Sequence, residues 1–221
     1  MYIPEQALPF VQAFLRSHHA MTELSNDATA ELDLSSLQGV AAGQEILIQR
    51  GGSKYTVTPL LAEHRVTCYG YSVSLTKNRL KTEYANLPGP EIGRLRRQNT
   101  TELYESFTEP LFCYIGDSTH RVFEQNPQIL QQHSVVVTEC SFLLDKDVAR
   151  AEETKHTHWK NLKPIVQANP QTLFMLIHFS LKHSALQWME LFHSVQTKQG
   201  LRNVHPMLVE EEVKSQWKRS S

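Results

Sequence analysis

Three short strand-like segments of this chain are each followed, within two residues, by a side chain that can bind a metal ion. In layered α/β folds, a site is assembled at strand ends, because the sheet fixes each Cα and the loop leaves the side chain reachable. Two imidazoles and one carboxylate suit Zn²⁺, and the carboxylate can bridge two ions. Any one such histidine is more often an ordinary hydrogen-bonded residue, so only the joint pattern predicts a site. The segments are residues 60–62, 112–115 and 174–177, followed by His64, Asp117 and His178.

The second half of the chain alternates strand-like and helix-like segments. The β-branched run 134–138 and the apolar run 173–177 predict buried strands. Helical periodicity is expected at 146–154, 162–168 and 184–194. This alternation predicts a layered α/β fold.

The first half predicts one helix and then several strands. Apolar spacing at 9–24 fits one helix face, and β-rich segments follow at 44–49, 55–61 and 67–75, with a turn at Gly51-Gly52. A further helix is expected over 120–132.

Composition excludes several classes of protein. The 221 residues suit one domain or two small ones, and the formal net charge of -1 announces no nucleic-acid or membrane partner, so any anion site must be a local patch. The three cysteines form no C-x-x-C pair, which argues against a disulfide framework or a cysteine zinc site. No basic leader is visible, and apolar runs such as 173–177 are far too short to span a bilayer. We therefore expect a cytoplasmic or nuclear protein that is neither secreted nor bound to a membrane.

A second polar cluster, His156-Thr157-His158, follows one of the predicted helices. It could bind metal, it could supply one general acid, or it could be a polar loop. Glu139 and Asp145 lie close enough in sequence to orient an imidazole by a hydrogen bond.

Basic residues cluster next to turn residues in only one stretch of the chain. Arg94, Arg96 and Arg97 follow the turn residues Gly89 and Pro90. Arginine suits phosphate because its planar fork donates two parallel hydrogen bonds. Taken alone, the stretch is better explained as a solvated loop.

Six segments occur in the order of the motifs of one known family, ribonuclease Z, the tRNA 3′-processing endonuclease. The resemblance covers nearly the whole chain except the tail. The segments are the histidine followed by a Gly-Tyr strand at 64–71, the Gly-Pro stretch at 87–92, the Gly-Asp-Ser-Thr at 115–119, the Glu-Cys-Ser-Phe at 138–142, the His-Thr-His at 155–158 and the His-Phe-Ser at 177–180.

The resemblance implies an α/β fold, the metallo-β-lactamase-type αβ/βα sandwich, here incomplete at the N-terminus. It implies zinc-dependent phosphodiester hydrolysis of precursor tRNA, with two zinc ions in the complete site. By resemblance, His64 binds one zinc, His178 binds the other and Asp117 bridges them. His156 then protonates the leaving oxygen, and Glu139 holds that imidazole.

The resemblance also implies an RNA-binding set and a domain layout. Lys182-His183 stands where the family usually has Arg-Tyr. The planar arginine group, which can donate two parallel hydrogen bonds, is thus replaced by the single ammonium group of a lysine. The layout is a C-terminal domain portion at 1–195, a short arm at about 78–103 and a polar tail at 196–221. The RNA-binding set is Gly89, Pro90, Arg94, Arg96, Arg97, Ser180 and Lys182.

The main metal motif of the family, H-x-H-x-D-H, is absent from these 221 residues. His18-His19 lies on a predicted helix and has no following aspartate in register. One hypothesis is therefore an enzyme that acts only with a complementing N-terminal half or as a homodimer. The alternatives are a non-catalytic remnant that binds RNA or a partner subunit, and a small-molecule zinc hydrolase of the same fold.

Overall fold

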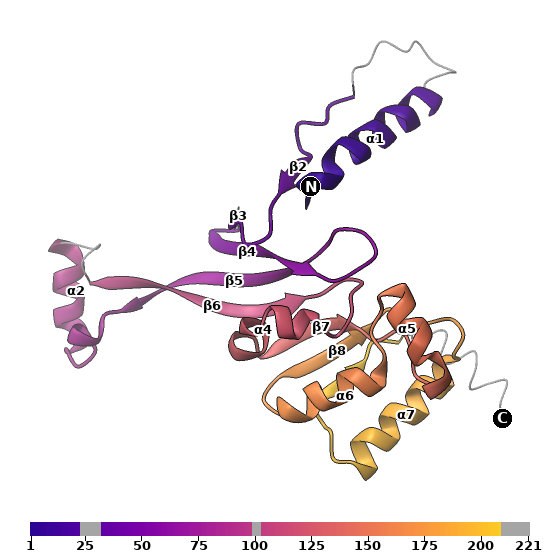
Figure 1. Ribbon diagram of the computed structural model, residues 1–221. Helices are drawn as coiled ribbons and strands as arrows, with labels where there is room; N and C mark the ends of the chain where they lie inside the picture. The colour runs from indigo at the N-terminus through magenta and orange to yellow at the C-terminus, as the bar shows by residue number, and fades with distance from the viewer. Residues whose placement is uncertain (23–31, 99–102, 209–221) are drawn as a thin grey trace.

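The computed structural model describes residues 1–22, 32–98 and 103–208. A seven-stranded mixed sheet forms its body, and a separate pair of short parallel strands, β1 and β2, lies near the N-terminus (Figure 1). The strands are β1 Tyr2–Pro4, β2 Gln38–Val40, β3 Ile46–Arg50, β4 Ser53–Ala62, β5 Cys68–Leu80, β6 Tyr104–Tyr114, β7 Val135–Glu139, β8 Leu173–Ile177 and β9 Val204–Pro206. The helices are α1 Leu8–Thr22, α2 Gly89–Gln98, α3 Val122–Gln125, α4 Gln128–Gln132, α5 Val148–Thr154, α6 Trp159–Ala168 and α7 Ala185–Lys198, with short 3₁₀ turns at Glu5–Ala7, Thr82–Tyr84 and Asp145–Asp147.

Strand direction brings the ends of four strands to one edge of the large sheet. The order is β3-β4-β5-β6-β7-β8-β9. Strand β5 is antiparallel to both β4 and β6, and β6, β7 and β8 are parallel, so β4, β6, β7 and β8 all run the same way. The carboxyl ends of these four strands therefore meet at a single edge.

Alternation along the parallel strands buries one face of the sheet under helices. Val136, Phe174 and Leu176 are fully buried and belong to one apolar cluster with Leu162 of α6 and Phe192 of α7. In Figure 1 the helices α4, α6 and α7 lie on the same side of β7 and β8. This packing fixes the strands whose ends carry the candidate site.

Strands β5 and β6 extend beyond the body as a long two-stranded arm. Their pairing continues to Leu80 opposite Tyr104, and α2 lies at the far end (Figure 1).

Most predicted elements are present, and the differences have local causes. Gly51 and Gly52 both have positive φ, 58° and 81°, as the tight turn between β3 and β4 requires. The helix expected over 120–132 is two short helices, because Pro127 removes a backbone donor between them.

The edge strand β9 lies inside the segment predicted to be a polar tail. Its Val204 is fully buried and pairs with Phe174, so the sheet continues past residue 195. Residues 23–24 of the first predicted helix, residues 99–102 of the arm and the end of the tail at 209–221 lie outside the described residues. Among the described helices, none combines the length and the apolar character needed to cross a membrane.

Candidate metal centre

Two of the three strand-end side chains, His64 and Asp117, come together with His156. His64 follows β4, Asp117 follows β6, and His156 follows α5 on the loop that leads into α6. One ligand atom from each of these residues lies within 4.8 Å of the others. Two imidazoles and a carboxylate at this spacing could hold one divalent cation.

His178 lies directly beside this group. Its Nδ1 is 3.6 Å from Asp117 Oδ1, and its ring stacks on that of His156 with centroids 5.2 Å apart. We call His64, Asp117, His156 and His178 the His–Asp cluster. Among the described residues, the set of ligand atoms that lie closest together includes His156, for which a general-acid role was expected. His178, which was expected to be a ligand, lies next to this set.

A backbone carbonyl sets the tautomer of His64. Its Nδ1 lies 3.0 Å from the carbonyl oxygen of Lys155, and a carbonyl can only accept, so Nδ1 carries the proton. The other nitrogen, Nε2, is left as the ligand atom. Metal-binding histidines are usually oriented by such a second hydrogen bond.

Glu139 is fully buried at the end of β7 and orients His156. The carboxylate accepts hydrogen bonds from Ser118 N at 2.6 Å and Thr157 N at 3.1 Å, and His156 Nδ1 lies 2.8 Å from it. The Ser141 hydroxyl donates to its second oxygen at 2.7 Å. The expected hydrogen bond between Glu139 and His156 is therefore present.

The hydrogen bond that His156 donates to Glu139 raises the pKa of His156 above its ordinary value of 6.5. Desolvation opposes this shift, and the charges of Glu139 and Asp117 add to it. An imidazole held in this way can carry a proton near neutral pH or present Nε2 to a metal.

Two non-glycine residues adopt left-handed backbone angles, one of them in the cluster and one directly before a cluster residue. Lys155 has φ 59° at the C-terminus of α5, and His178 has φ 60° just after β8. Such conformations are uncommon outside glycine and are usually found where the surrounding structure requires them. Here each one turns the chain sharply at a cluster residue.

The sequence missed the ion-pair network that joins the loops of the cluster. Glu63 accepts hydrogen bonds from Thr119 Oγ1 at 2.7 Å, Lys155 Nζ at 2.7 Å and Arg121 Nη1 at 3.3 Å. These contacts lower the pKa of the Glu63 carboxyl from 4.5 to about 2, with the Lys155 hydrogen bond the largest cause. The one available signal was its position next to His64.

His158 points away from the cluster and serves the fold. It is fully buried, its Nδ1 accepts a hydrogen bond from Lys160 N at the start of α6, and its Nε2 lies 3.0 Å from the Leu144 carbonyl oxygen. Its role is therefore that of a helix cap.

The predicted RNA-binding residues fall in two separate places. Gly89, Pro90, Arg94, Arg96 and Arg97 belong to α2 at the end of the arm, where the three arginines are exposed. Ser180 and Lys182 follow His178 instead, and Lys182 N donates to Ser180 Oγ at 3.3 Å. Figure 1 shows α2 well separated from the edge where β7 and β8 end.

Comparison with known proteins gives two curated relatives, both from Arabidopsis thaliana. The chain is 30% identical to "tRNase Z TRZ1" over 161 residues, which cover 70% of this chain and 56% of the relative. It is 21% identical to "tRNase Z TRZ2, chloroplastic" over 201 residues, 90% of this chain and 53% of that protein. The chain thus spans about half the length of the curated relatives it matches. No protein-family model matches it.

Similar solved structures include a human tRNase Z and a bacterial protein of the metallo-beta-lactamase fold. Human tRNase Z, short form, aligns with a TM-score of 0.47 and 13% identity over 82% of this chain and 60% of that one. The metallo-beta-lactamase fold protein YhfI from Bacillus subtilis aligns with a TM-score of 0.42 and 16% identity over 74% of this chain and 52% of that one.

The sequence relatives confirm the resemblance to ribonuclease Z that the motifs predicted. The mixed sheet and its layer of helices confirm the predicted α/β fold class. The identity of the metal and the role of each site residue stay predictions.

Proposed function

We propose that this relative of the tRNase Z proteins is part of a metal-dependent phosphodiester hydrolase that acts on precursor tRNA. The observation that carries the proposal is the convergence of the His–Asp cluster at one sheet edge, in the motif order of ribonuclease Z. The curated relatives are both named tRNase Z. The proposed substrate, precursor tRNA, and the proposed activity, hydrolysis, are inferred for this chain from its similarity to these relatives.

The donor set fits zinc. Imidazole nitrogen and carboxylate oxygen are zinc ligands, and catalytic zinc sites keep about three protein ligands. His64, Asp117 and His178 would hold the metal, with two ions in the complete site. A bound zinc would polarise the phosphate and supply an activated water.

His156 would donate the proton to the leaving oxygen. Glu139 lies 2.8 Å from Nδ1 of this imidazole and raises the pKa of His156, which would leave Nε2 as the atom that donates the proton. The buried carboxylate itself touches no solvent and acts through His156.

Further ligands would come from a complementing segment. The motif H-x-H-x-D-H does not occur in the 221 residues, and the His–Asp cluster alone leaves a two-metal site short of ligands. We propose that an N-terminal half carrying this motif completes the site, with a homodimer as the other arrangement.

The arm supports RNA over a small substrate. Exposed arginines on α2, far from the cluster, suit the backbone of a long polyanion that is held away from the cut. A cytoplasmic or nuclear location is part of this proposal, although one relative is named chloroplastic.

Two other functions remain as alternatives. A non-catalytic remnant that binds RNA or a partner subunit is favoured by the missing H-x-H-x-D-H. A zinc hydrolase of small esters or nucleotides would use the same cluster without the arm.

One experiment separates these functions. The chain would be purified alone and together with the H-x-H-x-D-H half of a tRNase Z, and zinc content and precursor-tRNA cleavage would be measured for both. We expect weak zinc binding and no cleavage for the chain alone, and cleavage for the pair that Asp117→Asn removes. RNA binding without cleavage in either sample would support the remnant, and cleavage by the chain alone would refute the need for a partner.

A further inference from the structure

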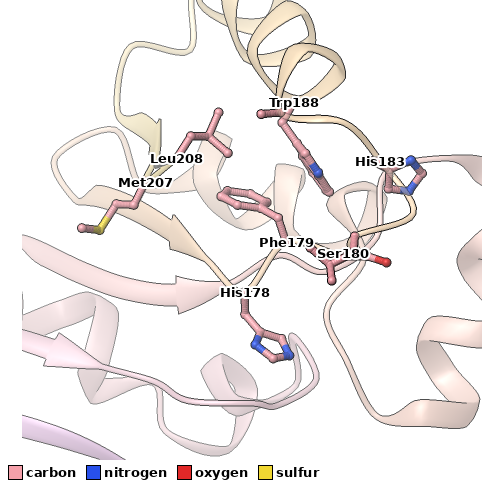
Figure 2. Close-up of a pocket in the computed structure, with 9 residues that line it drawn as sticks. His178, Phe179, Ser180, His183, Trp188, Met207 and Leu208 are labelled. Atoms are coloured by element: carbon pink, nitrogen blue, oxygen red, sulfur yellow. The ribbon is translucent and has the colours of Figure 1, made fainter. Parts of the chain in front are cut away.

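Two histidines of the His–Asp cluster, His178 and His64, are supported in different ways. His178 lines a cavity of about 190 Å³, and the next residue, Phe179, packs its ring 4.6 Å from that of Trp188 against the apolar core (Figure 2). Figure 2 shows the His178 imidazole pointing away from these two rings. The residues that follow His64, at 65–67, are exposed, so they give His64 no comparable apolar anchor. The direction of the His64 imidazole must therefore depend on polar contacts.

Lys155 supplies two such contacts, to His64 and to the residue before it. Its carbonyl oxygen accepts the hydrogen bond from His64 Nδ1 at 3.0 Å, and its Nζ lies 2.7 Å from Glu63 Oε1. A single contact would let the loop rotate about it, whereas two contacts to consecutive residues fix the loop and the imidazole together. Because His156 follows Lys155 in the chain, Lys155 also controls the spacing of the two imidazoles, whose ring centroids are 5.0 Å apart.

The backbone of Lys155 gives independent support for a role of its side chain. The residue has φ 59° and ψ 45° at the C-terminus of α5. Glycine is the usual residue in this left-handed conformation at a helix end, because it has no Cβ and so avoids the steric cost. The ion pair with Glu63 contributes little to stability, since the lysine side chain is 34% exposed. Stability alone therefore does not explain a lysine at this position.

We propose that Lys155 is a positioning residue of the metal site, which holds His64 with Nε2 free for a metal ion and thereby sets the affinity of the cluster for zinc. Glu63 also accepts a hydrogen bond from Thr119 Oγ1 at 2.7 Å, so the contact reaches the loop that carries Asp117. Loss of a group that orients a metal-binding histidine typically lowers metal affinity by about 10- to 100-fold. This inference rests on the metal-binding part of the proposed function and not on the substrate.

The first test measures the tautomer of His64 in the metal-free chain from the ¹⁵N chemical shifts of its ring, at alkaline pH, where imidazoles are neutral. We expect the Nδ1–H form in the native chain and a larger share of the Nε2–H form in Lys155→Met, which keeps the length of the side chain but has no charge. Lys155→Arg keeps the charge and should restore the native tautomer. The matched control is Lys77→Met, which removes the ion pair with Glu109 on the arm and should leave His64 unchanged.

The second test measures zinc affinity by titration calorimetry, for the chain alone and for the chain complemented with the H-x-H-x-D-H half. Lys155→Met should bind zinc about 10-fold more weakly, and Lys155→Arg and Lys77→Met should bind it as the native chain does. Lys155→Gly should also bind zinc about 10-fold more weakly while keeping its stability to urea, because glycine suits the backbone but lacks the ammonium group. A purely structural lysine would not separate affinity from stability in this way.

A native tautomer or a native zinc affinity in Lys155→Met would overturn the positioning role. Precursor-tRNA cleavage by the complemented chain is measured separately. Zinc binding that depends on Lys155 without cleavage would refute the hydrolase alone, and cleavage with unchanged zinc affinity in Lys155→Met would refute the positioning role alone. Absence of zinc binding in both native samples would overturn both proposals.

Discussion

The His–Asp cluster and the arm hold their functional side chains in opposite ways. At the cluster, strand ends fix the backbone, and the fully buried Glu139 receives two backbone donors and one hydroxyl besides facing His156. On the arm, the arginines of α2 are exposed at the tip of two strands that leave the body. Arg94 lies 3.8 Å from Glu91, a weak contact between two exposed side chains.

The difference separates a site built for chemistry from a surface built for affinity. Catalytic groups must be held within about 0.5 Å of a productive geometry, which requires support from neighbouring side chains. Phosphate contacts tolerate flexible cations, because they depend on charge more than on position. Substitutions should therefore damage stability or turnover at the cluster, and RNA affinity alone at the arm.

The largest effect is expected for Glu139→Gln. The glutamine side chain has the same shape as Glu139, but its NH₂ group cannot accept a hydrogen bond. The backbone or hydroxyl donors that face this group therefore lose their acceptor and stay buried and unpaired. We expect the free energy of unfolding in urea to fall by about 3–5 kcal/mol, the usual cost of breaking a buried charged group from its partners. Glu152→Gln, which removes the surface contact to Arg121, is the control and should cost less than about 1 kcal/mol.

Next in size is His156→Ala in the complemented enzyme. Losing one general acid should lower turnover by about 10² to 10⁴, with zinc content unchanged. His193→Ala, at an exposed position of α7, is the matched control and should be neutral. Loss of metal from the His156 variant would make that residue a ligand, in line with its place in the tightest set of the cluster.

The sequence predicted which residues form the cluster better than it predicted the loops and side chains that orient them. Apolar runs identify β4, β6 and β8. These strands run in the same direction, because β5 is antiparallel to β4 and β6 and because β6 and β8 are parallel to β7, so His64, Asp117 and His178 were predictable as neighbours at one edge. Their exact order around a metal depends on loop conformation. The left-handed backbone angle of Lys155 turns the chain just before His156, and no local sequence pattern predicted this angle.

Features that depend on contacts between distant segments were not predictable. Glu63 meets Thr119, Arg121 and Lys155 only after the strands have paired. Strand β9 is three residues long and polar in part, so its sequence shows no strand pattern. It forms because it pairs with β8 and because Val204 is buried. The cavity behind His178 likewise forms between α7 and the ends of β8 and β9.

A smaller effect is expected when Arg94, Arg96 and Arg97 are all replaced by alanine. RNA affinity should fall by about tenfold or more, and the slope of log affinity against log salt should drop by about 2 to 3. Stability to urea should stay unchanged because the side chains are exposed. The control replaces three exposed cations elsewhere, Lys160, Lys198 and Arg202. An equal loss of affinity in this control would show that general charge, and not the arm, attracts RNA.

The smallest effect concerns pH and the Glu63 network. The Glu63 carboxyl has a pKa of about 2 in the folded chain against 4.5 for the free group, so its ion pairs stabilise the fold fully above pH 4.5. Their contribution is lost as the pH falls from 4.5 toward 2, because the folded state must then take up a proton that the unfolded state already holds. The side chain is a quarter exposed, so solvent screening should limit the contribution to about 1 kcal/mol. Urea unfolding of the native chain and of Glu63→Gln should therefore differ by about this amount at pH 6, and the difference should shrink below pH 4.5 and vanish near pH 2. Curves that stay parallel over this range would mean that the loops around the cluster are held by packing and by the backbone bond from Thr119 N to the Glu63 carbonyl, and not by charge.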